Sequence, residues 1–345
     1  MKFDFCIGNP PYQQESVGAN ANDTPVYHYF FDAATSVAEK VELITPARFL
    51  FDAGGTPKDW NEKMLNDEHL TVKSYEQDSG KVFSGTSITG GVVVTYRDAK
   101  KVFGAIDVFS PFEELNTIVQ KVSSKSENDI SEIVTNRGLY RYSDLAYQEE
   151  PDEMKKTADR RIAPSCFERM PRLFTDIKPN DGYDYVRVYG NEGNDRTYKW
   201  FRRDYVSPVE NIDKYKVFIS KADGAAGTIG KPVPARVSGR PVVIEPGVIG
   251  TETYITIGSS SSKDEIEAIC KYIKTRFART LLGVLKVTQN NAKPTWRKIP
   301  LQDFTSASDI DWSAPIKAID QQLYKKYGLS DEEIRFIETH VKEMA

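Results

Sequence analysis

Apolar and polar positions alternate in the first residues of the chain. In residues 3–8, Phe3, Phe5 and Ile7 occupy every second position, which predicts a β-strand. Two prolines follow, and a proline can continue neither a central strand nor a helix. We therefore expect a buried strand that ends abruptly in a rigid polar loop, residues 9–12, with an aromatic residue at its tip.

Helical and strand-like patterns then alternate through the first hundred residues. Aromatic and alanine side chains recur at helical spacing in residues 26–38, which predicts an amphipathic helix with its aromatic face in the core. Short apolar runs predict further strands at residues 41–45, 70–75 and 92–96. We also expect a helix that starts with Thr56 as its N-cap and Pro57 at its first position, and that ends near residue 66.

The loop at residues 9–12 has the groups needed to bind an amino group on an aromatic base. The lone pair of such an amino nitrogen is delocalised into the ring, so the nitrogen is a poor nucleophile. An asparagine side-chain oxygen and a backbone carbonyl held by proline could each accept one N–H bond and turn the nitrogen towards a tetrahedral geometry. A neighbouring tyrosine ring can stack on the base. Such a loop acts by positioning and electrostatics and needs no titrating side chain.

Residues 3–13 resemble the catalytic motif of methyltransferases that transfer a methyl group from S-adenosylmethionine (SAM) to an amino group. This form of the motif points to adenine-specific DNA methyltransferases, or to enzymes that methylate a glutamine amide in protein. The rest of the chain resembles the adenine-specific methylases of type II restriction–modification systems in bacteria. The alternative is a chance Pro-Pro turn after a strand. The resemblance implies four catalytic residues: Asn9, Pro10, Pro11 and Tyr12.

Two later segments are also similar to this family. In the glycine-rich stretch at residues 81–91, the resemblance implies that Phe83 lies on the other face of the extruded base; the alternative is a core phenylalanine at a strand end. The stretch is not a phosphate-binding loop, because no Lys-Ser or Lys-Thr pair follows the glycines and a strand comes next. Arg48 could face the substrate or a DNA phosphate, or it could form a surface salt bridge.

The SAM site that the resemblance implies is largely missing from the sequence. In the family, a glycine-rich turn and an acidic residue normally precede the catalytic motif, and only eight residues precede it here. Residues 218–230 are the one downstream candidate, but Lys231 and Pro232 follow where a helix should begin, so a β-turn is the better interpretation. We expect a second chain or a missing N-terminal segment to supply SAM, and the isolated chain to bind SAM weakly or not at all.

The remainder of the chain has a different character. Residues 111–124 form a predicted helix with one apolar face, which marks the expected domain boundary. Beyond about residue 135, short aromatic strands and Gly, Asn, Asp and Pro turns indicate a β-rich module with long loops. Residues 201–300 hold 17 Lys and Arg against 9 Asp and Glu, although the whole chain has a net charge of −4. A basic segment on an acidic protein is typical of a local polyanion site.

The end of this basic segment combines side chains for phosphates with side chains for bases. Residues 286–300 contain Lys and Arg together with Gln and Asn, which read adenine edges. They resemble the end of the target-recognition domain in these methylases, where a Trp-Arg-x-Ile-Pro-like sequence recurs. The cations of residues 264–279 could instead form a solvated helix face. The candidate DNA-binding residues are Lys286, Gln289, Asn290, Lys293, Trp296, Arg297 and Lys298.

Composition narrows the picture further. A length of 345 residues is enough for about two domains. The three cysteines, Cys6, Cys166 and Cys270, are widely separated, which fits a reducing cytoplasmic environment and no disulfide framework. The spacing of Cys and His suggests no metal site. We expect neither a signal peptide nor a membrane-spanning segment.

The predicted fold class is α/β. A partial SAM-dependent methyltransferase (Rossmann-like) sheet domain at residues 1–110 precedes a mixed α+β target-recognition domain with a helical C-terminal tail at residues 111–345. The predicted function is site-specific methyl transfer from SAM to the exocyclic amino group of adenine in double-stranded DNA. The expected partners are double-stranded DNA and either a second chain that supplies the SAM-binding half or a restriction subunit. The alternatives are a DNA-recognition subunit without activity and a protein-glutamine methyltransferase.

Overall fold

The computed structural model describes residues 3–14, 24–51, 55–85, 88, 90–222, 229, 233–286 and 289–344. The chain is mixed α/β and divides into two compact units, Met1–Asn116 and Thr117–Ala345. The division falls inside helix α3 (Glu113–Ser123), the helix that was expected to mark the domain boundary.

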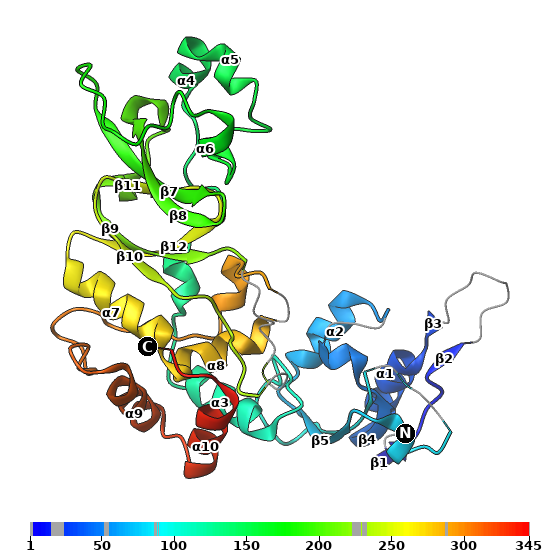
Figure 1. Ribbon diagram of the computed structural model, residues 1–345. Coiled ribbons are helices and arrows are strands. Elements are labelled where there is room, and N and C mark those ends of the chain that lie inside the picture. The colour runs from blue at the N-terminus through cyan, green and yellow to red at the C-terminus, as the bar shows by residue number, and fades with distance from the viewer. Residues whose placement is uncertain are drawn as a thin grey trace. The chain divides into compact units, whose positions relative to one another are not determined.

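Unit 1 is built on a four-stranded sheet in the order β1-β4-β6-β5 (Figure 1). The neighbouring strands β1 and β4 are parallel, and β6 is antiparallel to both β4 and β5. The strands of this sheet are Phe3–Gly8 (β1), Ala38–Pro46 (β4), Leu70–Glu76 (β5) and Val92–Asp98 (β6). A short separate pair consists of Gln13–Gln14 (β2) and Thr24–Pro25 (β3). Each predicted strand of this region is therefore present.

Two helices of unit 1 share an aromatic core with the sheet. They are Tyr27–Val37 (α1) and Lys58–Leu65 (α2). The buried rings of Tyr27 and Phe31 meet the ring of Trp60 edge-on, at centroid distances of 6.1 and 6.0 Å. Val41 and Leu43 of β4 belong to the same buried cluster. Tyr27, Phe31 and Ala34 of α1 thus lie in the core, as their spacing predicts, but Phe30 of the same predicted face is 44% exposed.

The start of α2 differs from the prediction. Pro57, and not Thr56, is the N-cap of the helix. The Thr56 hydroxyl instead donates a hydrogen bond of 2.6 Å to the side-chain oxygen of Asn61, and both side chains are buried. Thr56 therefore stabilises the first turn of α2 by binding the side chain of Asn61, and not by accepting from the unpaired backbone amides at the start of the helix.

The prediction that β1 is a buried strand is wrong. Phe3, Phe5 and Ile7 are 55, 57 and 73% exposed. The register explains this exposure, because Cys6 pairs with the buried Val41, and the odd-numbered side chains of β1 therefore point to the opposite face. Among the described residues, β1 pairs only with β4, so it is an edge strand.

Unit 2 contains two three-stranded sheets, in the orders β10-β9-β12 and β11-β7-β8. Buried side chains of both sheets, among them Val188, Phe201, Phe218 and Ile244, form one cluster. The six strands are Tyr185–Glu192 (β7), Asp195–Arg202 (β8), Tyr215–Ser220 (β9), Val242–Ile244 (β10), Val248–Gly250 (β11) and Tyr254–Ser260 (β12). Three short helices accompany the β7–β8 hairpin: Asp144–Glu149 (α4), Pro151–Met154 (α5) and Cys166–Arg169 (α6). A β-rich module with long loops is therefore present.

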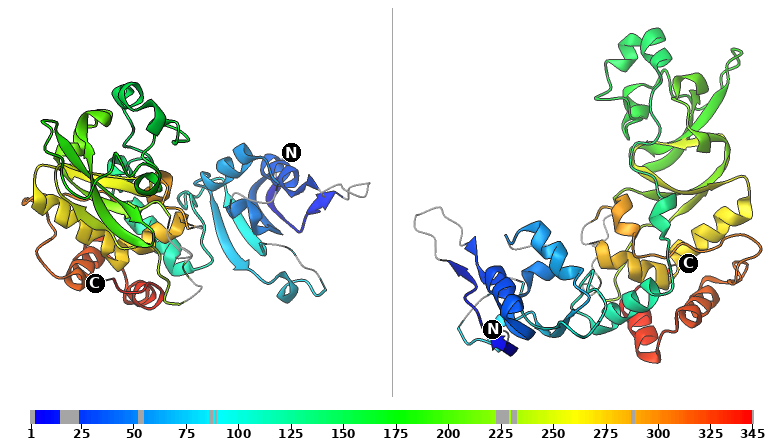
Figure 2. Two further views of the ribbon diagram at one scale, coloured as in Figure 1. Left: turned by 45° about the horizontal axis from the view of Figure 1, so that its top comes forward. Right: turned by 180° about the vertical axis from the view of Figure 1, so that it is seen from behind.

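Four longer helices complete unit 2. They are Lys263–Lys274 (α7), Arg276–Leu285 (α8), Ile316–Tyr327 (α9) and Asp331–His340 (α10). Helix α7 packs against β9, β10 and β12, while α9 packs against α7 and α8, and α10 against α8 (Figures 1 and 2). The single helix expected at residues 264–279 is therefore two helices, which are separated at Thr275.

A buried carboxylate secures this break. The backbone amides of Arg276 and Phe277 donate to Asp320 of α9 at 3.1 and 2.9 Å, and the Thr275 hydroxyl oxygen accepts from the Ala278 amide at 3.1 Å. These acceptors satisfy amides at the start of α8 that have no partner within the helix. Burial raises the pKa of Asp320 to about 6.

No helix in the described ranges has both the length and the apolar composition that a bilayer crossing requires. The same ranges hold no group of three or more His, Cys, Asp and Glu side chains arranged to bind a metal ion. Cys6, Cys166 and Cys270 are free thiols, as expected from their separation.

The raised pKa of Asp320 predicts a specific pH dependence of stability. The pKa of Asp320 is higher in the folded state than its ordinary value. The contribution of Asp320 to the free energy of unfolding is therefore fully present below about pH 4, and it declines as the pH rises through 6. The unfolding free energy of the wild type relative to Asp320→Asn should therefore fall between pH 4 and 7, by no more than about 3 kcal/mol. Denaturant titrations across this range would measure the difference, and a constant difference would contradict the prediction.

Candidate active site and nucleic-acid interface

The predicted catalytic loop lies where two parallel strands end. Strand β1 ends at Gly8, which pairs with Leu43 three residues before β4 ends at Pro46. Because the carboxyl ends of parallel strands meet at the same edge of a sheet, the loop at residues 9–12 lies beside the segment that follows β4. That segment is the 3-10 helix Ala47–Phe51 (η1).

Backbone contacts hold the far end of the loop. The Val26 amide donates to the Tyr12 carbonyl at 3.1 Å, and Gln13 pairs with Pro25 between β2 and β3. Tyr12 is half-buried; burial raises the pKa of its hydroxyl, which has no hydrogen-bond partner in the described part of the chain. Asn9 is exposed. The asparagine side chain is thus accessible to a ligand, while the tyrosine ring is held in place.

The loop lines an open hollow of about 550 Å³. Its lining residues are Asn9, Pro10, Pro11, Tyr12, Gln13, Pro46, Arg48 and Ile88. The structure therefore brings the four predicted catalytic residues together with Arg48. The sequence had left two roles for Arg48: contact with the substrate or a DNA phosphate, and a surface salt bridge. The described lining residues provide hydrogen-bond acceptors, an aromatic ring and one cation, and no carboxylate is among them.

Two glycines shape the wall beside Arg48. Gly90 and Gly91 have φ angles of 90° and 80°, in the region that glycine favours. A Cβ on Gly90 would lie 2.8 Å from Cγ of Arg48, and one on Gly91 would lie 2.4 Å from the carbonyl oxygen of Glu76. In the described part of the glycine-rich stretch, the glycines thus permit close packing at the start of β6. Its residues 86, 87 and 89 lie outside the described residues.

Phe83 lies next to the predicted stacking residue. Its backbone amide donates to the Ser79 carbonyl at 2.8 Å, at the end of a 3-10 turn (Ser79–Lys81, η2). The ring of Phe83 meets that of Tyr12 edge-on, with the centroids 6.4 Å apart. Phe83 is half-buried and is not among the residues that line the hollow. It therefore supports the position of the Tyr12 ring.

The described lining of the hollow offers little to SAM. This molecule has a positively charged sulfonium group, which Arg48 would repel, and none of the described lining residues is a carboxylate that could attract it or bind ribose hydroxyls. Of the alternative candidate site at residues 218–230, residues 223–228 and 230 lie outside the described residues. We assign no cofactor-binding residues.

The candidate DNA-binding segment is divided between the interior and the surface of unit 2. Lys286 is fully buried, and its ammonium group donates to the Val237 carbonyl at 2.7 Å. Trp296 is 1% exposed, and its indole N–H donates to the Asn291 carbonyl at 3.4 Å. These two residues do not face solvent, so we correct the prediction and exclude them from the interface.

The other members of the segment reach the surface. Gln289, Asn290 and Arg297 are exposed, and Lys293 and Lys298 are half-buried. Val287 and Thr288 lie outside the described residues. A 3-10 helix, Lys293–Trp296 (η6), runs between the two surface groups, and buried Trp296 anchors its end.

The cations of α7 and α8 do not form a solvated helix face. The Lys271 ammonium group donates to the Trp312 carbonyl at 2.7 Å, and the Arg276 guanidinium donates to the Val341 carbonyl at 3.1 Å. Arg279 is buried and donates to the Lys274 carbonyl at 3.1 Å. Much of the positive charge in this stretch therefore binds backbone oxygens within the protein.

A second hollow, which lies in unit 2, combines residues that sequence analysis did not bring together. It has a volume of about 490 Å³ and is lined by Asn136, Arg137, Lys221, Ile255, Asn290, Asn291, Ala292 and Lys293. Arg137 lies outside the basic segment, so a charge count along the chain could not identify it. No local motif connects residue 137 with residue 293.

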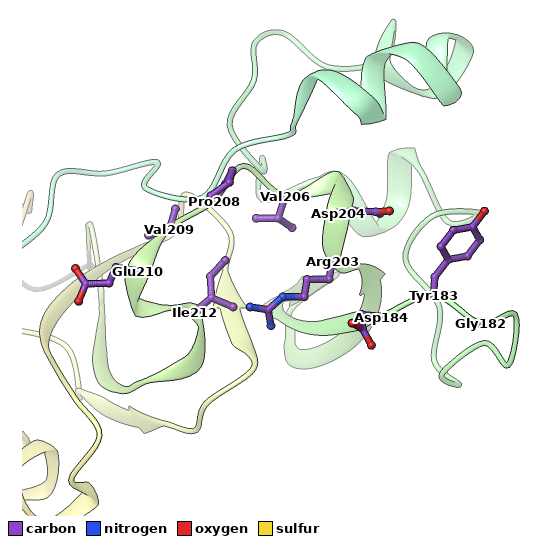
Figure 3. A pocket seen from close by; sticks show the side chains of 10 residues that line it. All are labelled: Gly182, Tyr183, Asp184, Arg203, Asp204, Val206, Pro208, Val209, Glu210 and Ile212. Atoms are coloured by element: carbon purple, nitrogen blue, oxygen red, sulfur yellow. The ribbon is translucent and has the colours of Figure 1, made fainter.

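A larger hollow of unit 2, of about 660 Å³, has a different character (Figure 3). Its charged lining residues are Asp184, Arg203, Asp204 and Glu210, so carboxylates outnumber cations. Figure 3 shows Glu210 at one end and Asp184 and Asp204 towards the other. Arg203 is in addition paired with Asp213. This hollow is unsuited to a polyanion.

The placement of the basic segment predicts how its members affect stability. Trp296→Ala should lower the unfolding free energy by about 3–5 kcal/mol, because a fully buried ring is removed, and Lys286→Ala should also destabilise the chain by leaving a buried carbonyl unpaired. Arg297→Ala, at the exposed neighbouring position, should change stability by less than about 0.5 kcal/mol. Denaturant titrations would compare the three variants; equal effects would contradict the assignment of buried and exposed positions.

Comparisons with known proteins give three results. No curated protein matches this chain. Among solved structures, the chain is similar to the type IIG restriction endonuclease BpuSI (8% identity, TM-score 0.33, 92% of this chain and 48% of that chain). It is also similar to the type IIL restriction-modification enzyme MmeI, determined in complex with DNA (11% identity, TM-score 0.29, 96% of this chain and 56% of that chain). The chain thus spans about half the length of each.

The third comparison concerns the N-terminal region. The family model "Eco57I restriction-modification methylase" matches residues 1–83. The matched residues include the loop at residues 9–12 and Arg48, which line the first hollow, and Phe83, whose ring contacts that of Tyr12. The match confirms the resemblance found at residues 3–13: the N-terminal region of this chain is related to the restriction-modification methylases.

Proposed function

We propose that this chain carries the catalytic loop and the target-recognition domain of an adenine-specific DNA methyltransferase of a restriction–modification system. The observation that carries the proposal is the position of Asn9, Pro10 and Tyr12. They form an accessible loop at the carboxyl end of β1, beside a parallel strand, within the region that matches the methylase family. This is the part of an open sheet at which ligands bind.

The loop would act on the amino group of an adenine that has left the base stack. The Asn9 side-chain oxygen and the Pro10 carbonyl would each accept one N–H bond of that group. Both acceptors favour a tetrahedral nitrogen, whose lone pair is then available for reaction, and they act more strongly as positive charge develops in the transition state. Proline limits the motion of the second acceptor because its ring fixes φ.

The rest of the hollow would hold the base and its strand. The Tyr12 ring would stack on the adenine, and its edge-on contact with Phe83 would fix the ring plane. Arg48 lines the same hollow and could bind a phosphate beside the extruded nucleotide. The described lining residues include no carboxylate, which is favourable to a polyanion.

SAM would supply the methyl group from a site outside this hollow. Strand β1 favours a further binding partner, because its edge has no paired strand among the described residues. A strand in a parallel sheet is also normally buried on both faces, whereas Phe3, Phe5 and Ile7 are exposed. A strand that paired with this edge would end beside Asn9. We propose that it belongs to the SAM-binding half, in a second chain or in another segment of the same protein. We also propose that a restriction subunit acts together with this chain and that the protein is located in the cytoplasm.

The hollow's poor fit to SAM also favours a second candidate function. A DNA-recognition subunit without activity of its own would use the basic surface of unit 2 and would need no cofactor. The two candidates differ in one measurable property, because only the first makes Asn9 essential for methyl transfer.

Asn9→Ala should abolish methylation of an adenine-containing duplex, with or without a partner chain, while it changes duplex affinity by less than about twofold. The reason is that Asn9 acts on the amino group and not on the duplex as a whole. Tyr12→Phe, which keeps the stacking ring, should retain most activity. A tritium-transfer assay and a duplex-binding assay would test both variants. Near-normal methylation by Asn9→Ala would refute the catalytic role.

The 345-residue chain alone should bind SAM weakly or not at all, because the described lining of the hollow beside Asn9 offers little to the cofactor. Calorimetric titration of the chain with SAM is the direct measurement. Micromolar binding would mean that the chain has a complete cofactor site, and would contradict the proposal that another segment or chain supplies it.

A further inference from the structure

The 490 Å³ hollow of unit 2 is assembled from four segments that are far apart in the sequence. Asn136 and Arg137 follow the 3-10 helix Ile130–Ile133 (η3), and Lys221 follows β9. Ile255 belongs to β12, and residues 290–293 lead into η6, which starts at Lys293. All four segments belong to unit 2.

Backbone hydrogen bonds fix one wall of the hollow to the sheet. The Thr135 amide donates to the Thr256 carbonyl of β12 at 2.9 Å, and the Thr256 amide donates back to the Thr135 hydroxyl at 3.0 Å. Val134 forms a β-bridge with Ile257. Asn136 and Arg137, which come directly afterwards, therefore start from a backbone with little freedom.

The opposite wall is fixed in the same way. The Asn291 amide donates to the Lys221 carbonyl at 2.7 Å, and the Asn291 side chain donates to the Ser220 carbonyl at 2.8 Å. Asn290 forms a β-bridge with Ala222. The buried Trp296 then holds the turn that leads to Lys293. A site built on rigid elements loses little conformational entropy when it binds a ligand.

The lining of this hollow is positively charged. Its described residues include Arg137, Lys221 and Lys293, and no carboxylate is among them. Lys221 is 3.3 Å from Glu252, which neutralises part of its charge. Arg137 is exposed and Lys293 half-buried, and neither forms an ion pair with another described residue. The acidic lining of the 660 Å³ hollow (Figure 3) shows that this charge is not a general property of the unit 2 surface.

We propose that this hollow is a nucleotide subsite of the DNA interface, in which Arg137 and Lys293 bind one backbone phosphate and Asn136 contacts the edge of the adjoining base. The inference rests on the proposed action on DNA. A hollow of this volume exceeds one phosphate and has room for the attached nucleotide. Arginine binds phosphate oxygens through two parallel N–H bonds, lysine adds a point charge, and asparagine can pair with an adenine edge.

The test measures binding of a labelled duplex to the full chain by fluorescence anisotropy over a salt series. The double variant Arg137→Gln and Lys293→Gln removes both charges but keeps long side chains. It should weaken binding about tenfold or more, and reduce the log–log salt slope by about 1, because one phosphate contact is lost. The matched control is Lys317→Gln and Lys325→Gln, two exposed lysines of α9, which should change neither quantity.

Asn136→Ala gives an independent readout of the same subsite. It should alter the preference between duplexes of different sequence by about fivefold or more, with little change in the salt slope, since an amide contributes no charge. Unchanged thermal stability of each variant would show that the fold is intact.

The outcomes separate this inference from the proposed function. If the wild type binds duplex DNA and the double variant behaves like the lysine control, the subsite is refuted while the methyltransferase proposal stands. If the wild type shows no salt-sensitive duplex binding, the action on DNA is refuted and the subsite with it. Loss of methylation in Asn9→Ala with normal binding would leave the subsite assignment unaffected.

Discussion

The parallel pairing of β1 with β4 is the constraint on which the candidate active site depends. It aligns Gly8 with Leu43, so the loop after β1 and the turn after β4 leave the sheet at the same edge. Helix α1 makes this pairing possible, because it carries the chain back along the sheet and buries Tyr27 and Phe31 in a core shared with β4. In an antiparallel arrangement, the Asn-Pro-Pro-Tyr loop and Arg48 would lie at opposite ends of the two strands.

The same strand also exposes apolar surface. Strand β1 has one described neighbour, and its apolar row, Phe3, Phe5 and Ile7, faces solvent. Burial of apolar surface contributes about 25 cal/mol per Å², so a layer packed over this row would stabilise β1 substantially. Because Asn9 follows β1 directly, such a partner would also fix the position of the candidate catalytic loop. We infer that partner binding and the geometry of the loop are coupled.

In unit 2, positive charge serves two different purposes. Lys271, Arg279 and Lys286 donate to backbone carbonyls inside the unit, where they satisfy acceptors that would otherwise be buried without partners. Arg137 and Lys293 instead line an open hollow whose described residues include no carboxylate. The net charge of a sequence segment therefore overstates its interface, since part of that charge holds the fold together. What favours a polyanion is the meeting of a few cations at one rigid site.

The sequence by itself determined the features that have local causes. Alternation and the two prolines predicted the strand and the loop at residues 9–12, and helical spacing predicted α1. The chemistry proposed for the loop also comes from local residues, Asn9 and its neighbours. Only the tertiary structure decided that β1 is an exposed edge, that Lys286 and Trp296 are buried, and that Arg137 meets Lys293. The physical reason is that periodicity and backbone preference are properties of adjacent residues. Exposure and side-chain contacts depend on which distant segments pack together, and no local pattern contains that information.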